Sequence, residues 1–258
     1  MSSMQNYPEL AGRTVVVTGG SRGIGAATAR LFAGNGAKVA VLGRDEAAIA
    51  EVVDGIVAGG GAAIGVAADT TVPADLARAR ARAEAELGPV DVLAAFAGGS
   101  TSAPGPITQI TEQQWRTAID DNLTATFLTL QAFLPGMIER GRGSVITMAS
   151  SAARQPTGKA PLAYAAAKAG VVMLTQQAAI ELGPQGVRIN CVAPSAIRTE
   201  RNQARIPANV QEQIAAAHPL RRLGESLDVA SAALFLASDS ASWLTGVTID
   251  VAGGLVTR

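Results

Sequence analysis

The chain has 258 residues, of which 48% are hydrophobic and 16% are charged, and its 21 lysines and arginines balance 21 aspartates and glutamates. This balance argues against nucleic acid as the main partner, because binding phosphates requires a basic surplus. The single cysteine and single histidine exclude a disulfide scaffold and cannot supply the usual three-ligand zinc site without carboxylates, so no metal is expected.

The N-terminal segment, residues 1–12, lacks the basic start and the apolar core of a signal peptide. No apolar run in the chain approaches the roughly 18–20 residues that a membrane span requires. We therefore expect a soluble, cytoplasmic protein that does not contact a membrane.

Short β-branched segments alternate with longer alanine-rich segments from residue 14 onward. Strands are predicted at residues 14–18, 38–42, 62–67, 90–95, 144–148, 186–192 and 247–251. Helices are predicted at residues 23–34, 45–58, 73–87, 111–140, 161–182, 209–217 and 227–238. Within 111–140, Thr111 can cap the helix and Pro135–Gly136 marks a kink or an end. Loops are expected at 98–108 and over most of 194–223.

The alternation of strands and helices predicts the fold. Strands that are apolar throughout are buried on both faces, and right-handed βαβ connections assemble them into a parallel sheet. The pattern predicts an α/β fold with a single Rossmann-type, doubly wound parallel sheet of about seven strands and helices on both faces. Because the sequence holds no internal repeat and no low-complexity linker, we expect one domain over residues 1–258.

A glycine-rich loop follows the first strand directly and opens the first helix. Gly19 permits the sharp turn out of the strand, Gly23 lets the backbone approach a pyrophosphate, and Gly25 lets the helix pack closely. The helix N-terminus supplies N–H groups and partial positive charge to phosphates. An ordinary strand-to-helix turn is the alternative. The expected dinucleotide contacts are Gly19, Ser21, Arg22, Gly23, Ile24 and Gly25.

The end of the second strand bears on the choice between NAD and NADP. A NAD site usually has an acid there, about 20 residues after the loop, but this chain has Gly43 followed by Arg44. Arg22 and Arg44 favour a 2′-phosphate, because a guanidinium pairs with phosphate oxygens in a fork. NADP is therefore preferred over NAD. A one-residue shift of the strand end would restore an acid, Asp45, and Arg44 alone could be a solvated residue.

A tyrosine and a lysine stand four residues apart in a predicted helix. This spacing places Tyr164 and Lys168 on one face. A free phenol has a pKa of about 10, and a nearby ammonium moves that pKa toward neutrality, where the phenol can transfer protons. Chance placement on an alanine-rich helix is the alternative for the pair taken alone.

Hydroxyl and amide side chains lie near the same expected edge of the sheet. Ser150 and Ser151 follow the fifth strand, and a hydroxyl there can donate to a substrate oxygen that gains negative charge. Asn122 is polar in an otherwise apolar helical stretch. Taken singly, the serines could be turn residues and Asn122 could face solvent.

Taken together, these residues resemble the short-chain dehydrogenase/reductase family, in particular its 3-oxoacyl reductases. The resemblance extends over about residues 10–254, and its order and spacing are more specific than any one motif. The matching features occur in family order: Thr18 and Gly19 through Gly25, Asp69, Ala97-Gly98, Asn122, Ser150, Tyr164 with Lys168, and Pro194 through Thr199.

The resemblance implies a catalytic role for four residues. Tyr164 would donate the proton in ketone reduction and accept it in alcohol oxidation. Lys168 would lower the pKa of Tyr164 and bind the nicotinamide ribose, and Ser150 would polarise the carbonyl. Asn122 would hold a water that links Lys168 to solvent. Counting back from Tyr164 by the commonest family gap selects Ser151 instead, but an insertion in the loop is easier than one in a buried strand.

The resemblance also implies further contacts with the dinucleotide. Asp69 and Thr70 would contact the adenine, and Ala97 and Gly98 would allow close approach of the cofactor. The nicotinamide carboxamide would be lined by Pro194, Ile197 and Thr199.

The chain departs from the family pattern at several positions. Ala95-Phe96-Ala97-Gly98 stands where Asn-Asn-Ala-Gly is usual, so support for the central sheet must differ there. Ser195 replaces a usual glycine, and Ala252 replaces a usual aspartate. None of these changes removes a catalytic group.

The resulting prediction is an NADP-dependent oxidoreductase that interconverts a ketone and a secondary alcohol, with a 3-oxoacyl thioester as one possible substrate. The alternatives are a catalytically silent dinucleotide-binding regulator and a non-redox relative such as a dehalogenase. By the resemblance, a homotetramer or a homodimer is expected. Its interfaces would be the long helices and the last strand.

The segment 196–223 is expected to form a substrate lid. Its charged residues include Arg198, Arg201, Arg205, Arg221 and Arg222 against Glu200 and Glu212. This surplus could attract an anionic substrate such as an acyl-carrier thioester, although solvated helix charges are the simpler interpretation. His218-Pro219 is interpreted as a lid hinge.

Overall fold

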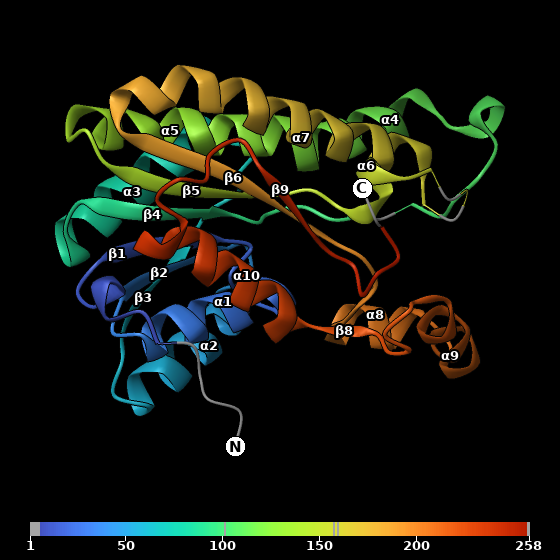
Figure 1. Cartoon of the computed structure of the whole chain (residues 1–258), viewed down its shortest axis with the longest axis horizontal. Coiled ribbons are helices and arrows are strands. Elements are labelled where there is room, and N and C mark those ends of the chain that lie inside the picture. The colour runs from blue at the N-terminus through green and yellow to red at the C-terminus, as the bar shows by residue number, and fades with distance from the viewer. Residues whose placement is uncertain (1–5, 101, 157, 159, 257–258) are drawn as a thin grey trace.

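Seven parallel strands form the main sheet of the computed structural model, which describes residues 6–100, 102–156, 158 and 160–256 (Figure 1). The strand order is β3-β2-β1-β4-β5-β6-β9, so the direction of winding reverses between β1 and β4. The strands are β1 Thr14–Thr18, β2 Lys38–Gly43, β3 Ala62–Ala67, β4 Val90–Ala95, β5 Gly143–Met148, β6 Val187–Pro194 and β9 Thr248–Val251. All seven correspond to predicted strands, and the doubly wound α/β fold is confirmed.

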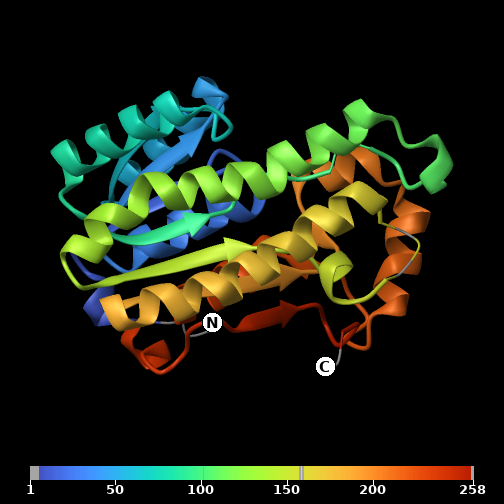
Figure 2. The ribbon, with the colours of Figure 1, turned by 90° about the horizontal axis from the view of Figure 1, so that it is seen from above.

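Helices cover both faces of this sheet, as Figures 1 and 2 show from two directions. One face carries α1 Gly23–Gly34, α2 Glu46–Ala58 and α10 Ser226–Ala237. The other face carries α3 Pro73–Leu87, α5 Ala125–Glu139 and α7 Leu162–Leu182. Short 3₁₀ turns occur at Pro8–Leu10, Ile107–Gln109, Gly183–Gln185 and Asp239–Ala241.

The alternation of side chains along a strand divides the core between the two faces. In β1, Val15 and Val17 pack with α1 residues such as Phe32, whereas Val16 packs with Phe133 of α5 on the opposite face. Successive side chains of a strand point to opposite faces, so a strand that is covered on both sides must be apolar throughout. Among the described residues, no helix combines the length and the apolar character that crossing a membrane requires.

The predicted helix over 111–140 is divided in the structure. Helix α4 spans Glu112–Ile119 and is capped by Thr111, a wider π-helical turn spans Asp120–Thr124, and α5 then continues to Glu139. Pro135 lies inside α5, so the helix does not end at Pro135–Gly136. The π-helical turn holds Asn122, whose side chain donates both to Ala118 of α4 and to Gly99 in the loop after β4. Such turns are frequent at functional sites.

The segment after β6 contains more regular structure than the sequence predicts. Ile197–Arg198 (β7) pairs with Gly224–Glu225 (β8), and between them lie α8 Glu200–Arg205 and the expected helix α9 Ala208–Ala217. A short helix after β5, α6 Ser151–Arg154, is also new. The elements that the sequence did not predict, α6, α8, β7 and β8, are too short to show a periodic pattern.

Candidate active site

A cavity of about 1260 Å³ lies at the carboxyl ends of the parallel strands, between the loop after β1 and the 196–223 segment. This edge is where doubly wound sheets bind ligands. Every residue that the sequence predicts for the site, except Asn122, lines the cavity. These are Gly19, Ser21, Arg22, Gly23, Ile24, Gly25, Arg44, Asp69, Thr70, Ala97, Gly98, Ser150, Tyr164, Lys168, Pro194, Ile197 and Thr199.

The glycine loop presents an open helix N-terminus to this cavity. Helix α1 begins at Gly23, and its N-cap residue Arg22 makes no side-chain capping hydrogen bond. A Cβ atom at Gly25 would lie 2.1 Å from the carbonyl oxygen of Gly19, so no larger residue fits there. Uncapped N–H groups with partial positive charge suit the pyrophosphate of a dinucleotide. The loop, its position and the size of the cavity therefore fit this ligand.

Both arginines near the expected ribose site are largely exposed. Arg22 pairs with Asp45 at 2.6 Å and Arg44 approaches Asp69 at 3.8 Å, while 65% and 74% of the two arginine side chains are exposed. Strand β2 ends at Gly43, so Asp45 lies beyond it and caps α2 by accepting from the N–H of Ala48. That hydrogen bond and Arg22 hold the pKa of Asp45 below its usual value.

A threonine supports the end of β4, where the sequence lacks the asparagine usual in the resembling family. The Oγ1 atom of Thr18 accepts hydrogen bonds from the N–H groups of Phe96 at 3.0 Å and Ala97 at 3.1 Å. The hydroxyl thus satisfies the backbone at the point where β4 leaves the sheet. Thr18 therefore ties the end of β1 to the backbone of Phe96 and Ala97.

Tyr164 and Lys168 share a face of α7, but the pKa of Tyr164 is raised, contrary to the expectation that Lys168 lowers it. Lys168 is buried, its Nζ donates to the carbonyl of Met148 at 2.8 Å, and it lies 5.8 Å from the centroid of the Tyr164 ring. Burial raises the pKa of Tyr164, while a hydrogen bond with Ser150 and the charge of Arg201 oppose that rise. Burial lowers the pKa of Lys168 from 10.5 to about 8, because desolvation disfavours the ammonium.

The structure distinguishes between the two serines after β5. Ser150 is the N-cap of α6, where its Oγ accepts from the N–H of Ala152 at 3.2 Å, and it hydrogen-bonds to Tyr164. Ser151 lines the same cavity but is the first residue of α6. Ser150 is therefore the serine placed beside the tyrosine hydroxyl.

Lys168→Met should change how stability depends on pH. Below pH 8 the wild-type lysine is charged in both states and its burial destabilises the fold. Between pH 8 and 10.5 the unfolded state alone keeps the proton, so wild-type stability rises with pH and the destabilisation disappears. The stability difference between variant and wild type should therefore shift by on the order of 3 kcal/mol over this interval.

Urea unfolding of both proteins from pH 7 to pH 10.5 measures this shift. Loss of the hydrogen bond to Met148 offsets the curve of the variant by a constant amount, so the change in the difference with pH is the informative quantity. Parallel stability curves would show that Lys168 has an ordinary pKa in the folded chain.

Asn122 is fully buried behind the cavity and braces the loop after β4. Its Nδ2 donates to the carbonyls of Ala118 at 2.9 Å and Gly99 at 3.1 Å, and its Oδ1 accepts from the N–H of Gly99 at 2.9 Å. A Cβ at Gly98 would lie 2.6 Å from this Oδ1, and Gly98 has φ +137°, so glycine is required beside it. The role of Asn122 in holding a relay water stays a prediction.

A serine–histidine contact, which the sequence did not predict, joins β6 to the 196–223 segment. The Oγ of Ser195 lies 2.9 Å from Nε2 of His218, whose Nδ1 lies 2.7 Å from the carbonyl of Ile214. Since only a protonated Nδ1 can donate to that carbonyl, Nε2 accepts from the serine hydroxyl in the neutral ring. The buried histidine thereby connects the end of β6 to the end of α9.

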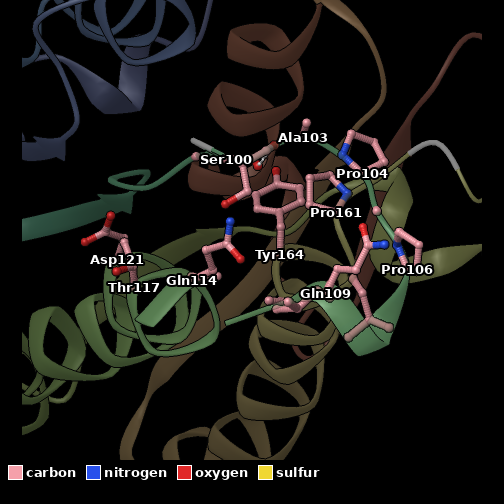
Figure 3. A pocket seen from close by; sticks show the side chains of 17 residues that line it. Ser100, Ala103, Pro104, Pro106, Gln109, Gln114, Thr117, Asp121, Pro161 and Tyr164 are labelled. Carbon is pink, nitrogen blue, oxygen red and sulfur yellow. Dashed lines mark hydrogen bonds between the residues drawn. The ribbon is translucent and has the colours of Figure 1, made fainter. Parts of the chain in front are cut away.

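A second cavity of about 210 Å³ adjoins the first at Tyr164. Figure 3 shows the tyrosine ring between Ser100 and Pro161, with Gln114 on the side of α4 and Gln109 on the opposite side, near Pro106. The loop before α4 and the start of α7 form its walls, and Gly99, Ser100, Asp121, Pro161 and Tyr164 line both cavities. The sequence marked this region only as a loop rich in glycine, serine and proline.

Known proteins resemble the chain over almost its full length. A family model described as enoyl-(acyl carrier protein) reductase matches residues 19–256. The chain is 37% identical over 246 residues to a 2,5-dichloro-2,5-cyclohexadiene-1,4-diol dehydrogenase of Sphingobium indicum, covering 95% of this chain and 96% of that protein. It is 38% identical over 244 residues to a cis-4-hydroxycyclohexanecarboxylate dehydrogenase of Sinomonas cyclohexanicum, covering 94% and 96% of the two chains.

A solved structure is similar throughout. A 3-oxoacyl-[acyl-carrier protein] reductase from Brucella melitensis with bound NAD matches with a TM-score of 0.90 and 32% identity, covering 99% of this chain and 95% of that one. The similar sequences and the similar structure are thus all named as dehydrogenases or reductases.

Proposed function

Since the chain belongs to the short-chain dehydrogenase/reductase family and is an oxidoreductase acting on alcohol and ketone groups, we propose that it interconverts a ketone and a secondary alcohol with NADP. The observation that carries this proposal is the group of Tyr164, Ser150 and Lys168 on the wall of one cavity with the glycine loop. The hydride is the chemistry that the bound dinucleotide supplies. The protein provides orientation and proton transfer.

Each of the chain's own groups has a distinct task in this proposal. The Tyr164 hydroxyl gives a proton to the substrate oxygen in reduction and takes it back in oxidation. Ser150, already bonded to that hydroxyl, donates to the same substrate oxygen as its negative charge develops. Lys168, with a pKa of about 8, can exchange its proton at physiological pH, and it binds the ribose hydroxyls. Asn122 keeps the 98–99 backbone in place beside them.

Two exposed cations and a missing carboxylate support NADP rather than NAD. Arg22 and Arg44 line the cavity beyond β2, and the strand ends in Gly43. The nearest acid in sequence, Asp45, is engaged in capping α2 and pairing with Arg22. A 2′-phosphate would bring two negative charges to this position, and fork-like pairing with guanidinium groups would stabilise them.

Wild-type protein should bind NADPH at least about tenfold more tightly than NADH, and Arg44→Asp should remove or reverse that preference. The reason is that a charge-assisted contact to the 2′-phosphate is worth roughly 1.5–3 kcal/mol. Fluorescence titration of both dinucleotides measures the two dissociation constants. Arg30→Asp, an exposed change on α1 outside the cavity, is the control. Tighter binding of NADH by the wild type would reject NADP.

We further propose that residues 1–258 act as one dinucleotide-binding domain in the cytoplasm, with 196–223 as the substrate lid. The proposed assembly is a homotetramer or a homodimer, which light scattering can distinguish. Large apolar side chains are exposed on the α4–α5–α7 side, and they support an interface there: Trp115, Phe127, Met173 and Ile180. A 3-oxoacyl thioester belongs in the substrate panel beside simple ketones and sugars.

A further inference from the structure

One arginine of the 196–223 segment lies inside the cavity beside the proposed proton donor. Arg201, in α8, lines the cavity with Tyr164 and Ser150. Its Nη2 donates to the carbonyl of Ser100 at 2.6 Å, and a Cβ at Gly99 would lie 2.6 Å from its Nη1. The side chain therefore extends from the lid segment to the loop after β4. Its charge opposes the rise in the pKa of Tyr164.

The other arginines of this segment whose side chains are described have different partners. Arg198 pairs with Glu225 at 3.4 Å and Arg222 pairs with Asp228 at 2.6 Å. Arg221 donates to the carbonyl of Ala216. None of these three lines the cavity. Among the arginines of this segment whose side chains are described, Arg201 alone lines the cavity, and Glu200 lines it too.

Among the described residues that line the cavity, three further charged groups bear on the surroundings of Tyr164. Glu200 lies toward Gly23, at the end of the cavity assigned to the dinucleotide. Lys168 donates to the carbonyl of Met148, and its Nζ lies 5.8 Å from the centroid of the tyrosine ring. Asp121 lies on the side of α4, and in the view of Figure 3 Ser100 stands between it and the ring of Tyr164. A carboxylate attached to a substrate held at Tyr164 would therefore meet Arg201 on the side of the lid.

We propose that Arg201 binds a carboxylate of the substrate, so that the enzyme acts on oxo acids and the corresponding hydroxy acids in preference to neutral ketones and alcohols. This inference rests on the proposed function and names its substrate class. A guanidinium carries five N–H donors in a planar fork, so its bond to Ser100 is compatible with pairing to both oxygens of a carboxylate. Arg201 then both holds the 196–223 segment to Ser100 and binds the carboxylate of the substrate.

Matched pairs of substrates test the proposal directly. The probes are 4-oxopentanoate and 5-oxohexanoate, each compared with its methyl ester, in NADPH-dependent reduction. Wild-type kcat/KM should favour the acid over its ester by about 10- to 100-fold for at least one pair. Arg201→Leu should abolish this ratio by lowering kcat/KM for the acid, whereas Arg201→Lys should keep part of it, because a lysine retains the charge without the fork.

The ratio of kcat/KM for the acid to kcat/KM for its ester distinguishes recognition of the carboxylate from general effects on catalysis. Any change in the pKa of Tyr164 or in lid position acts on both members of a pair and cancels in their ratio. Arg198→Leu, a change in the same segment outside the cavity, should leave the ratio unaltered. Calorimetric titration of 4-oxopentanoate into the complex with NADP⁺ gives a readout independent of turnover, and Arg201→Leu should weaken this binding by a similar factor.

Three results would overturn the inference, and they can be told apart. If wild type reduces acid and ester equally well, Arg201 does not recognise the carboxylate and the proposed function stands. If Arg201→Leu lowers both members equally, the arginine only holds the lid to Ser100. If no acid, ester, simple ketone, sugar or 3-oxoacyl thioester is reduced, the proposed function fails and the inference fails with it.

Discussion

Tyr164→Phe should lower kcat by roughly 10²- to 10⁴-fold, the range expected for removing a general acid–base group. The ring remains in place, so packing on α7 and the cavity walls change little, but no hydroxyl is left to exchange a proton with the substrate oxygen. Affinity for the dinucleotide should stay within a few fold of wild type, because the glycine loop and the arginines are untouched. Steady-state kinetics and dinucleotide titration measure the two quantities.

The sequence contains a matched control for this variant. Tyr7 is the only other tyrosine. It does not line the cavity, and its backbone N–H donates to the side chain of Asn35. Tyr7→Phe removes the same atom and should leave kcat unchanged. An undiminished kcat in Tyr164→Phe would refute the assignment of proton transfer to this residue.

Gly25→Ala should weaken dinucleotide binding by roughly 10- to 100-fold and lower the free energy of unfolding by about 1–3 kcal/mol. The added methyl group would lie 2.1 Å from the carbonyl oxygen of Gly19 and 2.7 Å from its carbon. Backbone cannot move aside as a flexible side chain can, so the loop must open. The N–H groups of α1 then no longer converge on the phosphates.

Helix α1 contains another glycine, Gly34, at which a change to alanine should have the opposite effect. Gly34 is the last residue of α1, and a Cβ there would meet nothing within 4 Å. Gly34→Ala should leave binding unchanged and be neutral or stabilising by up to about 1 kcal/mol, since alanine restricts the unfolded chain. Chemical denaturation of both variants measures the free energy of unfolding, and fluorescence titration measures the affinity for the dinucleotide. Equal behaviour of the two variants would mean that the loop adapts and that the close approach at Gly25 is unimportant.

The elements of the main sheet were readable from the sequence because burial on both faces demands continuous apolar strands. Thr14–Thr18 and Val90–Ala95 show this most clearly, and the structure has both with unchanged bounds. The short elements were not readable. Helix α6 has four residues, and β7 and β8 have two each, which is too few for an amphipathic period of about 3.6 or 2 residues to repeat.

The π-helical turn that divides the predicted helix into α4 and α5 has its cause in another part of the chain. Nothing local requires a π-helical turn at Asp120–Thr124. The turn accompanies two hydrogen bonds between the side chain of Asn122 and the backbone of Gly99, a residue 23 positions away; Asn122 donates one and accepts the other. Only the packing of the loop after β4 against this helix makes those bonds possible.

For the candidate site, local spacing was sufficient where the chemistry lies within one element. The glycine loop and the Tyr164–Lys168 pair are of this kind, since a turn or a helix face sets their geometry. The tertiary structure decided the rest. It placed Ser150 beside Tyr164, connected Ser195 to His218, and brought Arg201, among the arginines of residues 196–223 whose side chains are described, to the cavity. Such choices depend on which strand ends and loops meet across the cavity, and the order of residues along the chain does not contain those distances.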